Sequence, residues 1–139
     1  MRQTHTTFTL RTRGQGLYEF TSEVTRWLQA EQAHSGVLTL FCRHTSAGLT
    51  IQENADPDVL HDLTAFFNRL VPEGASWFRH TDEGPDDMPA HIRSTLSGVS
   101  LSIPVCQGRM MLGTWQGIFL FEHRQMPHHR QVAGCFVGE

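Results

Sequence analysis

Apolar and polar residues alternate along several short stretches of the chain, a period typical of β-strands with one buried face. Residues 4–12 read THTTFTLRT, with β-branched threonines at alternate positions, and a glycine-rich turn follows them. The same signals predict further strands at residues 36–42, 49–53, 99–105, 109–113, 114–122 and 130–137. The sequence therefore predicts about seven strands with short connections.

Three other stretches carry apolar residues at helical spacing. Residues 20–33 form the first. Asp56, followed by proline, is typical of a helix start and predicts a helix over residues 57–70. Pro89 is expected to open a third helix, which Gly98 ends. Helices set among strands with short connections predict one compact α+β domain over residues 1–139, built from antiparallel β-sheets or a sandwich.

The segment of residues 72–88 has no usable period and is rich in proline, glycine and acidic residues. Irregular segments of this length in a compact domain are often functional. Trp77 and Phe78 suggest a loop pinned to the core, and disorder is the alternative. Trp115, in the predicted strand 114–122, is expected to be buried.

Composition excludes several classes of function. The formal net charge is −3, and no basic field suited to nucleic acid is expected. All 11 positively charged side chains are arginines, so chemistry that needs a lysine is excluded, including Schiff bases and the P-loop. The 3 widely spaced cysteines are expected to be reduced thiols of a cytoplasmic protein. We expect no membrane association, because no apolar stretch of about 18 residues occurs.

Three of the histidines lie where a scaffold presents side chains. His44 falls in a turn between strands, His80 in the acidic segment and His91 in the first turn of a predicted helix. Three imidazoles could form an open Zn²⁺ site with a place for water or substrate. Their spacing is not a metal signature, so ordinary hydrogen-bonded histidines fit the sequence as well.

Carboxylates lie near two of these histidines. Four acidic residues between His80 and His91 could orient imidazoles, accept protons or bind a hard cation such as Mg²⁺. They are Asp82, Glu83, Asp86 and Asp87. A solvated acidic loop is the alternative. We predict Asp86 and Glu122 as catalytic carboxylates.

Side chains suited to a phosphorylated ligand occur at two other places. Arg124 and Arg130 flank the turn after Glu122 and could hold an anion bidentately. Thr45 and Ser46 lie in a glycine-containing turn that could contact phosphate. Gln116 is a further candidate for substrate binding, on a predicted strand.

Three ordered segments cover much of the chain. They read HTSAGLTIQENADPDV, FRHTDEGPDDMPAHIRSTLSG and IPVCQGRMMLGTWQGIFLFEHR. Together they resemble the YjbQ-like family, also called secondary thiamine-phosphate synthase enzymes. The resemblance implies a compact α+β homotrimer with polar, histidine-containing clefts that bind a metal, and a weak thiamine-phosphate synthase activity.

The leading hypothesis is a metal-assisted enzyme that joins a pyrimidine diphosphate to a thiazole phosphate and releases pyrophosphate. Its substrate would be a small phosphorylated metabolite, and its cofactor a divalent ion, Zn²⁺ or Mg²⁺. A second hypothesis is a binding module that holds a metal or a small anion without chemistry. A third is a metal-dependent hydrolase, with Glu122 or an acidic-segment carboxylate as the base.

Overall fold

Eight strands and three helices make up the chain in a computed structural model that describes residues 1–139. In chain order the elements are β1 (Arg2–Thr12), β2 (Gly16–Glu19), α1 (Thr21–Ala30), β3 (Gly36–Cys42), β4 (Ala47–Glu53), α2 (Pro57–Leu70), α3 (Asp87–Ser97), β5 (Ser100–Cys106), β6 (Arg109–Met110), β7 (Gln116–Glu122) and β8 (His128–Gly138). The predicted α+β domain with three helices is confirmed.

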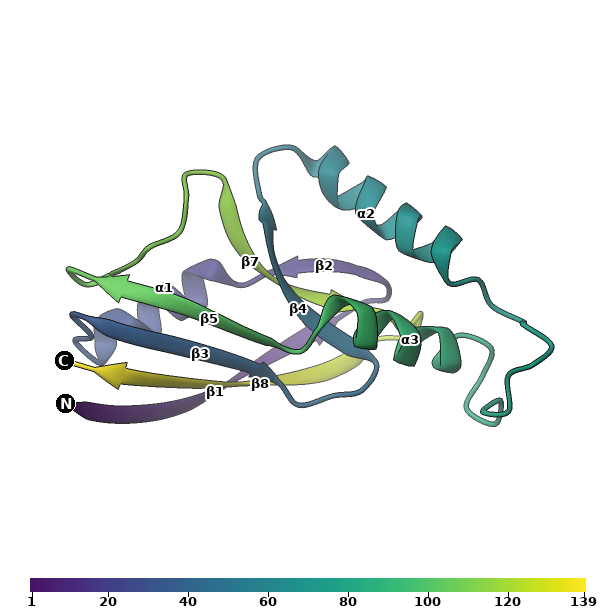
Figure 1. The fold of residues 1–139 in the computed structure, drawn as a ribbon, viewed down its shortest axis with the longest axis horizontal. Helices are drawn as coiled ribbons and strands as arrows, with labels where there is room; N and C mark the ends of the chain where they lie inside the picture. Colours follow the sequence, from purple (N-terminus) through teal and green to yellow (C-terminus); the bar gives the residue numbers. More distant parts are fainter.

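The strands form two antiparallel sheets. One has five strands in the order β1-β8-β3-β5-β6, and the other has three in the order β2-β7-β4. The longest pairing, between β1 and β8, runs from Arg2 opposite Gly138 to Thr12 opposite His128. Both termini therefore lie at one end of the molecule, and α3 lies toward the other end (Figure 1).

The core fills the space between the inner face of the five-stranded sheet, the three-stranded sheet and α1. Alternate residues of the strands point into it, as the period of two predicts. Leu38 and Leu40 of β3 and Phe136 of β8 are completely buried there. α1 adds Val24 and Leu28 to the same cluster.

A close approach of backbones positions α3 against β4. A Cβ atom added to Gly48 would lie 2.4 Å from the carbonyl oxygen of Gly98 and 2.7 Å from Oγ of Ser97. Real Cβ atoms do not make such contacts, so only glycine allows this packing. It holds the C-terminal end of α3 against β4, and Nδ1 of His91 in the middle of the helix lies 2.8 Å from the carbonyl oxygen of Thr45, in the turn between β3 and β4.

The structure corrects four predictions about local structure. Residues 16–19, expected to follow the end of a strand, form β2, which pairs with β7. α3 begins at Asp87 rather than at Pro89, which lies inside its first turn. Trp77 is 74% exposed and Trp115 is 62% exposed, so neither is held in the core. Each lies in a connection between elements, where no second layer covers its side chain.

Candidate functional site

A cluster of two histidines and an aspartate lies where the irregular segment of residues 71–86 meets α3. Asp87 is the first residue of α3, and His91 follows one turn later on the same face. His80 approaches from the irregular segment, and its Nε2 lies 2.6 Å from Oδ2 of Asp87. Nε2 of His91 lies 3.0 Å from the same oxygen. One donor atom from each of the three residues lies within 4.8 Å of the others, a spacing suited to a metal ion.

The protonation of His91 follows from its second contact. Its Nδ1 lies 2.8 Å from the carbonyl oxygen of Thr45. A carbonyl can only accept, so Nδ1 carries a proton, and in the neutral ring Nε2 would then present a lone pair. That lone pair would face a carboxylate oxygen of Asp87. The contact is attractive only if a second proton or a cation lies between the two atoms, which is the arrangement of a metal ligand oriented by its other nitrogen.

The second oxygen of Asp87 binds Arg124. Nη1 of Arg124 lies 2.6 Å from Oδ1 of Asp87, and Nε lies 2.9 Å from Oδ2 of Asp86. Burial alone would raise the pKa of Asp87, but the hydrogen bond from His80, the positive charge of His91 in its protonated form and the charge of Arg124 bring it below its usual value. Asp87 therefore stays ionised, with one oxygen left for the histidine side.

Asp86 and Arg124 hold the site together rather than facing open solvent. Asp86 is buried and also accepts a hydrogen bond from the backbone N–H of Gln125. Burial would raise its pKa, but the bonds from Arg124 and Gln125 lower it. A third nitrogen of Arg124, Nη2, donates a hydrogen bond to the carbonyl oxygen of Glu83. In this structure the two residues predicted for catalysis and anion binding are engaged with each other.

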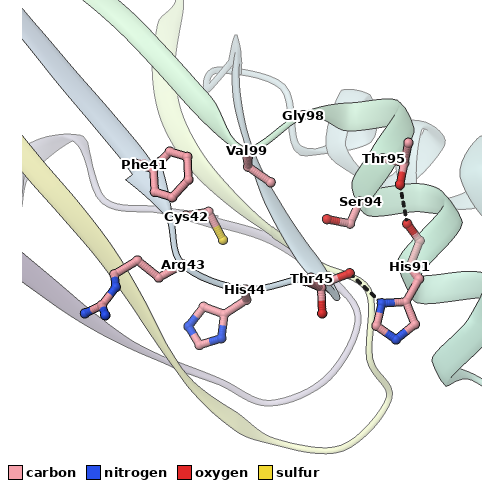
Figure 2. A pocket seen from close by; sticks show the side chains of 10 residues that line it. All are labelled: Phe41, Cys42, Arg43, His44, Thr45, His91, Ser94, Thr95, Gly98 and Val99. Carbon is pink, nitrogen blue, oxygen red and sulfur yellow. Dashed lines mark hydrogen bonds between the residues drawn. The ribbon is translucent and has the colours of Figure 1, made fainter.

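A cleft of about 630 Å³ opens beside the cluster (Figure 2). The turn after β3 and the inner side of α3 line it. Its residues are Phe41, Cys42, Arg43, His44, Thr45, His91, Ser94, Thr95, Gly98 and Val99. None of them is acidic, and His91 belongs both to the cleft and to the cluster. The cleft can therefore receive a ligand that also reaches the cluster.

His44 lines the cleft but is not a member of the cluster. Its Nε2 accepts a hydrogen bond of 2.7 Å from the backbone N–H of Gln131. In Figure 2 the rings of His44 and His91 flank Thr45. The structure thus brings together two of the three predicted metal ligands, His80 and His91, and supplies Asp87 in place of His44.

Two other predicted site residues, Glu122 and Arg130, lie in the protein interior. Glu122 is completely buried, and Arg130 is 4% exposed. Glu122 accepts hydrogen bonds from Nε of Arg130 at 2.8 Å and from Oγ1 of Thr12 at 2.6 Å. Burial would raise the pKa of Glu122, but these bonds and the charge of Arg130 lower it. The pair joins β7 to β8 and presents no surface to a ligand.

Of the three remaining residues predicted to bind substrate, only Thr45 lies at the cleft. Ser46 is buried, and its hydroxyl accepts a hydrogen bond from Arg130. Thr45 is exposed at the cleft. Gln116 begins β7, far along the sheet from His44, and its side chain accepts a bond from the backbone N–H of Gly113.

Asp87 was singled out by the sequence only as one of four acidic residues. The signal that could have found it is its spacing of four residues from His91, which places both on one helix face. That signal was lost because the helix was expected to begin at Pro89. His123, which follows Glu122, was expected to emerge with it at the end of a strand, but it is 1% exposed, and burial lowers its pKa to about 3.

Comparisons with known proteins agree with this architecture. Residues 6–139 match the family model described as UPF0047 protein YjbQ-like. A UPF0047 protein of Synechocystis is 52% identical over 138 residues, covering 99% of this chain and 94% of that protein. The UPF0047 protein YjbQ of Escherichia coli is 43% identical over 134 residues, with 96% of each chain covered.

Solved structures resemble the whole chain. A crystal structure of a hypothetical protein from Aeropyrum pernix has a TM-score of 0.88 and 31% identity, and covers 98% of this chain and 99% of that one. A YjbQ/UPF0047 family protein from Clostridium acetobutylicum has a TM-score of 0.87 and 32% identity, with 95% and 99% covered. None of the three helices described above is long and apolar enough to cross a membrane.

Proposed function

Because the chain belongs to the YjbQ-like UPF0047 family and carries a histidine and carboxylate cluster beside an open cleft, we propose that it is a metal-assisted enzyme with weak thiamine-phosphate synthase activity. One observation carries the proposal. Nε2 of His91 lies 3.0 Å from Oδ2 of Asp87 while its Nδ1 donates to Thr45, and a cation bound between Nε2 and the carboxylate would make that contact favourable.

The ligand atoms favour zinc over magnesium. His80 and His91 would each supply a nitrogen, and Asp87 one oxygen, because Arg124 holds the other. Three protein ligands of this kind, with a position left for water or substrate, are typical of catalytic Zn²⁺ sites. Mg²⁺ prefers six oxygen ligands in octahedral geometry.

The proposed reaction joins a pyrimidine diphosphate to a thiazole phosphate. The thiazole nitrogen forms a bond to the pyrimidine methylene carbon, the carbon–oxygen bond to the diphosphate breaks, and pyrophosphate leaves with the bonding electrons. A bound cation would supply positive charge to offset the charge of the departing pyrophosphate. Arg43, exposed at the cleft, would attract the phosphate groups, and Thr45 would donate a hydrogen bond to them.

A second candidate, a binding module, is favoured by the state of the nearby carboxylates. Asp86 and Asp87 are ion-paired with Arg124, and Glu122 is buried with Arg130. None of them is free to act as a general base at the cleft. A small phosphorylated metabolite would then be held without chemistry. For both candidate functions we propose a cytoplasmic location, because the three cysteines are free.

Metal analysis and product assays test the proposal together. Purified protein should bind Zn²⁺, and His80→Ala should lose the metal and the formation of thiamine phosphate. The matched control is His61→Ala, because the side chain of His61 is 79% exposed on α2, outside the cleft and the cluster. Full zinc content in His80→Ala would contradict the ligand assignment. Zinc binding with no thiamine phosphate formed would favour the binding module.

Assembly into a homotrimer is part of the same proposal. No helix of the chain covers the outer face of the five-stranded sheet. At the centre of its three middle strands, β8, β3 and β5, this face carries no charged residue. Its residues are Val37, Thr39 and Phe41 of β3, Ser100, Ser102 and Pro104 of β5, and Ala133, Cys135 and Val137 of β8. Val37 lies opposite both Pro104 and Val137, so the apolar residues adjoin. Such a face is suited to burial against further copies of the chain.

Light scattering of the purified protein tests the assembly. We expect a mass of three times the 15.8 kDa chain, and Val37→Glu should shift it toward the monomer, because an isolated charge would be buried at the contact. A native protein that stays monomeric at micromolar concentration would refute the trimer.

A further inference from the structure

We propose that His44 is a neutral hydrogen-bond donor in the cleft, which contacts an acceptor oxygen of an anionic ligand through its Nδ1–H and does not bind the metal. The ligand part of this proposal rests on the proposed function, because it needs the cleft to be a binding site. The protonation state of the ring does not rest on it.

The tautomer follows from the contact with Gln131. A backbone N–H can only donate, so the Nε2 atom that receives it at 2.7 Å must carry a lone pair. The ring is therefore neutral, and its proton lies on Nδ1. Burial, followed by the charge of Arg130, lowers the pKa of His44, which is consistent with a neutral ring.

The same contact removes His44 from the set of metal ligands. Its lone pair is already occupied by the N–H of Gln131, and its other nitrogen carries a proton. His91 differs in which nitrogen it presents. Thr45 accepts the Nδ1–H of His91, so a neutral His91 would present the lone pair of Nε2 where His44 presents an N–H. The cleft thus contains two different imidazoles: His91, which can bind a metal through Nε2, and His44, which can donate a hydrogen bond through Nδ1.

The other donors of the cleft show what ligand would fit. The hydroxyl of Ser94 donates to the carbonyl oxygen of Ala47 at 2.8 Å. The hydroxyl of Thr95 donates to the carbonyl oxygen of His91 at 2.9 Å. The donors left for a ligand are the Nδ1–H of His44, the hydroxyl of Thr45 and the guanidinium of Arg43, whose single side-chain contact is with Gln131 at 3.4 Å.

The cleft therefore offers donors without any carboxylate among its lining residues. A ligand that presents acceptors, such as a phosphate group, can satisfy these donors, whereas a cationic or donor-rich ligand cannot. His44 would then be a binding residue that selects for an anionic oxygen.

Nitrogen NMR of histidine-labelled protein tests the tautomer directly in metal-free protein. The resonances of His44 are assigned by their loss in His44→Asn. We expect a protonated Nδ1 and an unprotonated Nε2. Added Zn²⁺ should shift the nitrogens of His80 and His91 and leave those of His44 in place. A protonated Nε2 in His44, or nitrogens that shift as metal ligands do, would overturn the proposal.

Binding of zinc and of inorganic phosphate by calorimetry tests the role. His44→Ala should keep its zinc affinity and bind phosphate about tenfold to a hundredfold more weakly, the expected loss of a hydrogen bond to a charged group. In His44→Asn the amide nitrogen can replace Nδ1, so phosphate binding should largely return. His61→Ala, with an exposed histidine, is the control.

The outcomes separate the two proposals. If no zinc binds but His44 has the expected tautomer, the metal-assisted function fails and the assignment of His44 stands. If zinc binds as expected but His44→Ala loses it too, the assignment fails and the function stands. If native zinc-loaded protein does not bind phosphate, or if His44→Ala binds it unchanged, the proposed ligand class is refuted.

Discussion

The buried imidazole of His123 should make the fold sensitive to mild acid. His123 directly follows β7 of the three-stranded sheet and is 1% exposed. Its Nε2 lies 3.3 Å from Oγ of Ser97, and its ring packs on Phe121 with centroids 4.4 Å apart. Burial, followed by the charge of Arg93 from α3, lowers the pKa of His123 to about 3. Glu122 and Arg130 are the other charged groups that face it, and their effects oppose each other.

The sign and size of the effect follow from linkage. The unfolded state takes up a proton near the ordinary histidine pKa of about 6.5, whereas the folded state does not until about pH 3. Unfolding therefore becomes easier as the pH falls through this window. The free energy of unfolding should drop by about 1.4 kcal/mol per pH unit below pH 6, which amounts to about 2 kcal/mol between pH 6.5 and 4.5.

Urea unfolding at a series of pH values measures this contribution. In His123→Gln the titrating group is gone while an amide can still reach Ser97, so the variant's stability should vary less with pH than that of the native protein between pH 6.5 and 4.5. The slope is compared rather than the absolute stability, because the substitution also changes packing. His61→Gln, at an exposed site, should follow the native curve. Parallel curves for His123→Gln and native protein would refute the reasoning.

Two further substitutions test the framework that positions the site. Glu122→Gln should lower the free energy of unfolding by about 3–5 kcal/mol in urea titrations, because Arg130 would stay buried without its charged partner, and a loss below about 1 kcal/mol would argue against the pair. Gly48→Ala should cost about 1–3 kcal/mol and weaken zinc binding, because the new Cβ would push α3 away from β4. Gly113→Ala meets only a flexible side chain at 3.4 Å and should be tolerated; equal effects of the two alanines would contradict the close approach.

Most of the fold was open to prediction because strands and helices here follow their apolar periods. β3 and α2 begin and end where the sequence placed them, and the long pairing of β1 with β8 has the alternation expected of a half-buried strand. β2 was missed because it has four residues between glycines and the start of α1, too few to show a period. The exposure of Trp115 could not be predicted, because the burial of a side chain in a turn depends on which other elements pack over that turn.

The site was only partly predictable for a different reason. His80 and His91, which flank the acidic segment, were predicted to converge with His44, and the structure brings these two together. His44 looked equivalent by its place in a turn, and only the position of β8 shows that the N–H of Gln131 occupies its Nε2. Likewise Glu122 ends an apolar strand, and the sequence does not reveal that Arg130, eight residues later, folds back onto it inside the protein.

Beyond Val71, which is buried, the irregular segment over residues 72–86 is attached to the rest of the molecule mainly by polar contacts. Gln125 donates to Glu73, Arg124 donates to the carbonyl oxygen of Glu83, and His80 meets Asp87, whereas Trp77 lies in solvent. With little apolar area to lose, this segment should detach in local opening events that cost much less than global unfolding. Its amides should exchange hydrogen with solvent well before those of the sheets. Each opening would carry His80 away from Asp87, giving a cation a way in or out while the β-sheets and α3 remain folded.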